Sequence, residues 1–138
     1  MPHRHLLTLA LALASALGLA LAAPAAAQPH PDWSRAPAVE VVLKSFSFTP
    51  STLRLRAGVP VRLTLRDVKG GHNFAAPGFF AAARIAPADT AKLAKGKVEL
   101  RGGETVTIRL VPAAGTYKLA CTHFLHAGFG MKGTIVVS

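Results

Sequence analysis

Two neighbouring stretches in the first half of the 138-residue chain alternate apolar and polar side chains one by one. In "STLRLRAG" and "VRLTLRDV" the polar positions are mostly arginine, and the alternating aliphatic positions are Leu53, Leu55, Val61, Leu63 and Leu65. A period of two puts successive side chains on opposite faces of a β-strand, whereas a helix needs a period near 3.6. The stretches therefore predict strands with one buried face and one solvated face.

The chain from residue 39 onward adds more short β-rich segments bounded by glycine or proline. Together they suggest about seven strands, a number typical of an all-β domain built as an antiparallel sandwich or barrel. Residues 79–95 are rich in alanine and lysine and predict a short helical insertion of one or two turns. Pro87 suits an early helical position and Gly96 suits a helix end.

Residues 1–27 have the pattern of a secretory signal peptide. The basic start "MPHRH" precedes an uncharged apolar run that ends in small residues, with Ala27 or Ala25 as the last residue before cleavage. An uncleaved membrane anchor is the alternative, because the run approaches the length of a spanning helix. We expect residues 28–37, which are rich in proline, to form a flexible arm and residues 38–138 to form one folded domain.

The charge of the chain is strongly basic. It has 16 Lys and Arg against 6 Asp and Glu, and removing Arg4 with the signal leaves 15 against 6, a formal charge of +9. The excess indicates either a basic face for an acidic partner or a merely solubilising surface. Only Lys92, Lys95 and Lys97 lie close together. Export and the absence of aromatic residues among the charges argue against nucleic-acid binding.

The sequence "CTHFLHAGFGMKGTIVV" gathers the donor atoms of a metal site. Cys121 is the only cysteine, so it forms no internal disulfide, and an exposed thiol would oxidise in an exported protein. His126 and Met131 follow at intervals of four intervening residues. Thiolate, imidazole and thioether together suit copper, and two His with one Cys and a weak axial Met form a blue-copper site. The second histidine expected from this pattern is His72 in "GGHNF", because Gly70 and Gly71 allow the chain to turn there.

These two motifs, "GHNF" and C-x4-H-x4-M-x-G-T-I-V-V, resemble the cupredoxin family of plastocyanin, pseudoazurin and azurin over residues about 39–138. The resemblance implies a Greek-key β-sandwich that binds one copper ion through His72, Cys121, His126 and Met131. It also implies that Asn73 ties the two ligand loops together through hydrogen bonds, as residues around metal ligands often do.

His123 has no counterpart in the family motif and competes with His126 for the equatorial ligand position. In strand geometry the side chains of Cys121 and His123 would share a face. The longer spacing of His126 allows a turn that brings it to the metal from another side, so we expect His126 to be the ligand. Most phenylalanines are expected in the core. Phe124 and Phe129 lie within the ligand loop, and one of them is a candidate for an exposed apolar rim where a redox partner docks.

The sequence thus predicts an exported or periplasmic type 1 copper protein that carries one electron between redox partners and is not an enzyme. We expect an acidic partner, either a cytochrome or a membrane oxidoreductase, and a monomeric protein with no stable membrane insertion after signal cleavage. A periplasmic copper-handling protein is the alternative, although such proteins favour methionine-rich tracts and this chain has two methionines. A cysteine-nucleophile enzyme or a structural zinc site leaves Met131 without a role.

Overall fold

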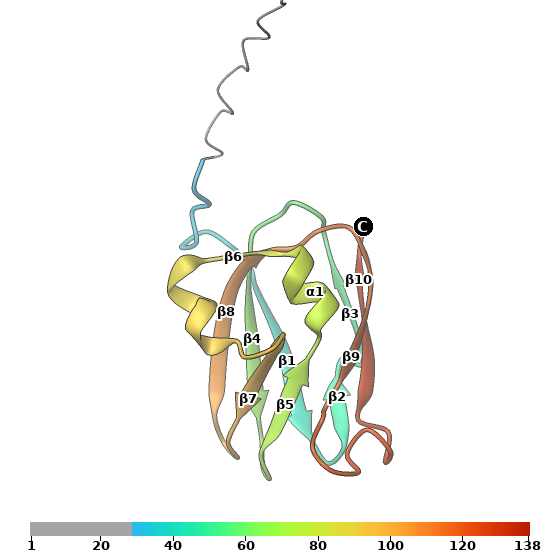
Figure 1. Ribbon diagram of the computed structural model, residues 1–138. Helices are drawn as coiled ribbons and strands as arrows, with labels where there is room; N and C mark the ends of the chain where they lie inside the picture. Colours follow the sequence, from blue (N-terminus) through green and yellow to red (C-terminus); the bar gives the residue numbers. More distant parts are fainter. Residues whose placement is uncertain (1–28) are drawn as a thin grey trace, which may run out of the picture.

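The computed structural model describes residues 29–138, so the predicted signal peptide lies outside the described residues. Two five-stranded sheets pack face to face (Figure 1). One sheet has the order β2-β1-β4-β8-β6 and the other β3-β10-β9-β5-β7. The strands of the first sheet are β1 Ala38–Lys44, β2 Ser47–Thr49, β4 Val61–Asp67, β6 Arg84–Ile85 and β8 Thr105–Val111. Those of the second are β3 Thr52–Leu55, β5 His72–Ala75, β7 Lys97–Leu100, β9 Gly115–Ala120 and β10 Lys132–Val137.

The predicted all-β sandwich is confirmed, and its strand directions are mixed. Most neighbouring strands are antiparallel, but β1 pairs with β4 and β3 pairs with β10 in parallel. The sequence pattern did not predict these parallel pairs, because the alternation of apolar side chains decides only which face of a strand is buried. That alternation is the same for either strand direction. The predicted helical insertion is also present, as helix α1 Pro77–Ala82 and 3-10 helix η1 Pro87–Lys92.

The core lies between the two sheets and is built from the alternating residues. The aliphatic side chains of β3 and β4 identified in the sequence are all buried. Phe48 of the first sheet meets Phe74 of the second edge-on, with ring centroids 5.9 Å apart. Phe79 and Phe80 of α1 join this core. Phe46 differs from the expectation for most phenylalanines, since 41% of it is exposed.

A buried carboxylate fixes the helical insertion to the first sheet. Asp89 of η1 is 1% exposed and accepts hydrogen bonds from Arg109 of β8 through the backbone amide at 2.9 Å and through Nε at 2.7 Å. The Lys92 ammonium lies 2.7 Å from the other carboxylate oxygen. Burial by itself raises the pKa of Asp89, but the hydrogen bonds from Arg109 and Lys92 outweigh it and hold that pKa well below its usual range.

Asp89→Asn should therefore destabilise the protein at neutral pH by about 2 kcal/mol, because a charged hydrogen-bond network loses its anion. The depressed pKa means that Asp89 contributes stability above its unfolded pKa of about 3.9, and that this contribution is lost as the pH falls through the folded value. Urea unfolding of both proteins should show a difference that shrinks below about pH 4.

The matched control for Asp89 is Glu40, whose exposed carboxylate lies 3.2 Å from Arg66. Glu40→Gln should change stability by less than about 0.5 kcal/mol, because exposed ion pairs are solvated and flexible. Equal losses in the two variants would contradict the structural role of Asp89.

Candidate metal centre

The candidate site lies at one end of the sandwich, where four connections meet: β1–β2, β4–β5, β7–β8 and β9–β10 (Figure 1). The β4–β5 connection delivers His72 and the β9–β10 connection delivers the loop from Cys121 to Met131. Gly70 and Gly71 have φ angles of +101° and +74°, a left-handed conformation that favours glycine. The predicted turn before His72 is therefore present.

Cys121 and Met131 form the buried base of this loop. Both are 0% exposed, and the Cys121 amide donates to the Met131 carbonyl at 3.1 Å. The Met131 amide donates in turn to the His126 carbonyl at 3.0 Å. These backbone hydrogen bonds connect Cys121, His126 and Met131 within the loop. The loop therefore holds two sulfur-bearing residues and an imidazole close together.

Three donor atoms converge in the loop. One ligand atom each from Cys121, His123 and His126 lie within 4.8 Å of one another. The Cys121 Sγ atom is 3.5 Å from His126 Nδ1. The His72 ring packs beside the His126 ring, with centroids 5.2 Å apart. The structure therefore groups the predicted ligands Cys121 and His126 with His123, and places the His72 ring and the buried Met131 beside this group; which of them bind the metal stays a prediction.

Electrostatics favour the metal-binding form of His126. Its partial burial, together with the neighbouring imidazoles of His72 and His123, lowers the pKa of His126. A neutral imidazole keeps one ring nitrogen free to bind a metal. The backbone N–H of Asn73 donates to Cys121 Sγ at 3.4 Å, a contact that stabilises negative charge on the sulfur.

Asn73 joins the two ligand loops, as the resemblance implies. Its Oδ1 atom accepts a hydrogen bond from the Thr122 amide at 2.9 Å, and its Nδ2 group donates to Thr122 Oγ1 at 2.9 Å. Nδ2 also donates to Glu99 Oε2 at 3.1 Å. Because Asn73 is fully buried, these bonds hold the start of the cysteine loop against β5.

Two residues around the site were not identified from the sequence. Asp67 is 1% exposed, and its Oδ2 atom accepts from His72 Nδ1 at 3.1 Å, which orients the His72 ring. Its Oδ1 atom has no hydrogen-bond partner among the described residues. A signal was available, because the alternation of Val61, Leu63 and Leu65 continues inward to Asp67. Glu99, which contacts His123 Nε2, gave no such signal because it occupies an outward position of β7.

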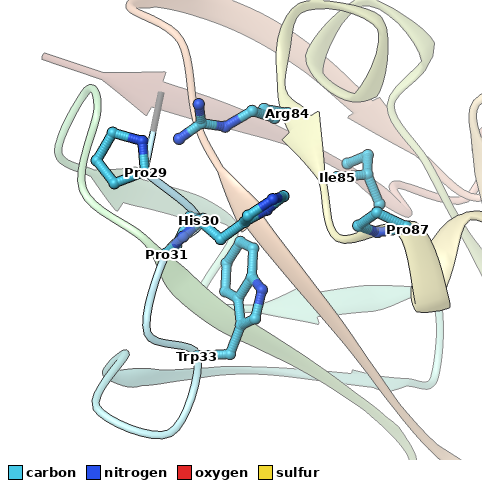
Figure 2. Close-up of a pocket in the computed structure, with 7 residues that line it drawn as sticks. All are labelled: Pro29, His30, Pro31, Trp33, Arg84, Ile85 and Pro87. Carbon is cyan, nitrogen blue, oxygen red and sulfur yellow. The ribbon is translucent and has the colours of Figure 1, made fainter. Parts of the chain in front are cut away.

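A separate pocket of about 180 Å³ lies at the opposite end of the sandwich (Figure 2). The residues that line it are Pro29, His30, Pro31, Trp33, Arg84, Ile85 and Pro87. It places residues 29–33 of the Pro-rich segment beside β6, and its lining contains a single imidazole and no sulfur donor. His30 is therefore remote from the metal centre.

The donor set fits copper. A buried thiol, imidazoles and a buried thioether are soft to intermediate ligands, which bind copper in preference to magnesium or calcium. A β-sandwich with these donors at one end defines the class of small copper-site proteins.

Comparisons with known proteins agree with this class. The chain belongs to the copper binding proteins of the plastocyanin/azurin family, whose family model matches residues 37–138. It is a blue copper protein, and copper is its cofactor. The comparison with curated proteins found no match.

Solved structures of auracyanins share the fold. Auracyanin B is 24% identical, with 81% of this chain and 93% of that chain covered and a TM-score of 0.55. Auracyanin from the photosynthetic bacterium Roseiflexus castenholzii is 19% identical, with 73% and 96% covered and a TM-score of 0.54. Auracyanin A, a "blue" copper protein from the green thermophilic photosynthetic bacterium Chloroflexus aurantiacus, is 22% identical, with 74% and 99% covered and a TM-score of 0.51.

Proposed function

We propose that this protein carries single electrons between redox partners and has no catalytic turnover of its own. The proposed ligands are His72, Cys121, His126 and Met131. Bound there, copper supplies a one-electron couple between Cu(I) and Cu(II). Four protein ligands would leave no position for a substrate, which supports a carrier rather than an enzyme. The burial of both sulfur donors supports a resident ion rather than a copper cargo that is passed on.

The observation that carries this proposal is the setting of His126. An exposed apolar face lies beside this imidazole and consists of Phe46, whose ring contacts it, and of the ligand-loop residues Phe124, Leu125 and Phe129. Their exposed fractions are 41%, 88%, 54% and 65%. The Phe46 ring meets the His126 ring edge-on at 4.9 Å and the Phe129 ring at 5.4 Å. Clustered exposed apolar side chains are costly in water and mark a docking surface.

The position of His126 in this face suits electron transfer. Because a ligand imidazole lies among the docking side chains, a partner seated there would approach the copper through one ring. Electron tunnelling falls steeply with distance, so a short path through His126 is the physical advantage of the arrangement. The sequence suggested that one of Phe124 and Phe129 is exposed at an apolar rim. In the structure both are exposed.

Charge around the apolar face suits an acidic partner. The basic rim, as we name it, consists of four exposed residues at this end of the sandwich: Lys69 and Arg101 on connections, Lys44 at the end of β1 and Lys132 at the start of β10. Opposite charges steer encounter at long range and raise association rates. The Lys92 ammonium instead binds Asp89 and the Thr107 carbonyl, so it is held within the insertion. We therefore assign steering to the basic rim ahead of the cluster of Lys92, Lys95 and Lys97.

The partner and compartment follow from the same features. We propose an acidic cytochrome or the exposed domain of a membrane oxidoreductase, in the periplasm or an equivalent exported space, and a monomeric carrier. The pattern of residues 1–27 supports export. None of the helices within residues 29–138 combines the length and apolar character needed to cross a bilayer.

Electron exchange with an acidic c-type cytochrome should slow as salt rises. We expect the bimolecular rate, followed by stopped-flow absorbance, to fall as ionic strength passes through about 0.1 M, where the screening length is about 10 Å. Reversing Lys44, Lys69 and Lys132 to glutamate should lower the rate at low salt by about tenfold or more, because steering becomes repulsion.

The matched control reverses three exposed arginines at or near the other end of the sandwich, Arg35, Arg54 and Arg56. It makes the same change in net charge and should affect the rate much less. Equal effects of the two triple variants, or rates that do not depend on salt, would refute steering by the basic rim. A copper-loaded protein that exchanges no electrons but transfers copper to an acceptor would favour the copper-handling alternative.

A further inference from the structure

The metal centre holds one more imidazole than the proposed ligand set uses. His123 offers a ligand atom within 4.8 Å of those of Cys121 and His126, and its ring centroid is 5.3 Å from that of His126. A rotation of its side chain would bring it to the copper. Some contact of His123 must therefore determine whether the copper has two imidazole ligands or three.

Glu99 of β7 contacts His123, which follows β9, although β5 lies between these two strands in the sheet. His123 Nε2 donates a hydrogen bond to Glu99 Oε1, and Glu99 Oε2 accepts from Asn73 Nδ2 at 3.1 Å. Glu99 lies directly opposite Asn73 in the pairing of β5 with β7. Both carboxylate oxygens are thus engaged, one by the imidazole and one by a buried residue of the sheet, so the carboxylate is oriented toward His123.

The backbone before His123 is fixed as well. Thr122 forms two hydrogen bonds with the Asn73 side chain, so His123 has mainly its side-chain torsions free. The His123 side chain is 33% exposed and that of Glu99 is 56% exposed, whereas Cys121 and Met131 are fully buried. The bond to Glu99 therefore holds the imidazole at the solvent-facing side of the centre and limits its rotation toward the metal.

We propose that Glu99 is a positioning residue that keeps His123 out of the copper ligand set. The proposal rests on the ligand set given under the proposed function and not on electron carriage. Two His and one Cys in a plane with a weak axial Met give the blue-copper geometry, whereas additional nitrogen ligands favour tetragonal Cu(II). By fixing the orientation of the His123 ring through Nε2, so that the ring does not turn toward the metal, Glu99 preserves the first geometry.

Glu99→Ala tests this in the full copper-loaded protein by visible absorption and electron paramagnetic resonance. The released His123 should bind Cu(II) in part of the molecules. The thiolate-to-copper band should then lose intensity and shift to shorter wavelength, and a second resonance component with wider copper hyperfine splitting should appear. Glu99→Gln retains a carbonyl acceptor for His123 Nε2 and should stay close to the unaltered spectrum.

The double variant Glu99→Ala/His123→Ala should recover the unaltered spectrum, because no third imidazole remains. Glu40→Ala is the matched control, since the Glu40 side chain is 52% exposed and pairs with Arg66 in the other sheet. It should leave both spectra unchanged. A Glu99→Ala protein with unaltered spectra overturns the proposal, and so does a double variant that keeps the altered spectrum. Absence of the band from the unsubstituted protein would refute the ligand set itself, whereas slow electron exchange would refute only the carrier role.

Discussion

Cys121→Ser should abolish the intense visible band of the copper-loaded protein while the fold persists. The band comes from charge transfer between a thiolate and Cu(II), and Cys121 is the only sulfur of that kind in the chain. Serine is nearly the same size, so the buried position and its contact with the Asn73 amide lose little packing. We expect complete loss of the band by absorption and an unchanged β-sheet spectrum by circular dichroism.

Metal analysis of the unsubstituted protein should accompany this variant and give one copper per chain. Met131→Leu is a useful comparison because it removes the weak axial donor while keeping the buried volume. That variant should retain a visible band with a changed reduction potential. A Cys121→Ser protein that keeps the band, or a colourless Cu(II) complex of the unsubstituted protein, would show that Cys121 is not the ligand.

His126→Ala should remove an equatorial ligand and bleach the centre, and added imidazole should restore the colour. The physical reason is that His126 Nδ1 lies 3.5 Å from Cys121 Sγ and its ring lies in the exposed apolar face, so an external imidazole has access to the vacated position. His123→Ala should leave the spectrum nearly unchanged, because Glu99 holds that imidazole. Absorption titrations with copper and then imidazole measure both effects.

The two histidine variants control for each other, because each removes one imidazole from the same loop. If His123→Ala bleached the centre and imidazole restored it, the equatorial role would pass to His123. In that case Glu99 would orient His123 as a copper ligand rather than keep it out of the ligand set.

The buried faces of the strands were predictable from single residues. Leu53, Leu55 and Leu63 are buried where the alternation placed them, because the two faces of a strand differ only in their exposure to water. Strand direction was not predictable from that pattern. The parallel pairing of β10 with β3 depends on how the chain returns across the sandwich, which no local segment records.

The candidate site was partly predictable for a related reason. Cys121, His126 and Met131 lie within one short segment, so their order and spacing can be read from the sequence. The glycines before His72 likewise indicate a turn. Their neighbours come from other strands, one near in the chain and one distant. Asp67 reaches His72 from the end of β4, and Glu99 of β7 reaches past β5 to His123 in the loop after β9.

The sequence by itself determined the all-β class and, through the two motifs, the copper-binding family, because strand periodicity and ligand chemistry are properties of short segments. Only the tertiary structure decided that His123 joins the group around Cys121, that Glu99 contacts it, and that Phe46 completes the apolar face around His126. The contacts of Glu99 and Phe46 join residues far apart in the chain. They exist only because two sheets pack together and bring four connections to one end of the sandwich.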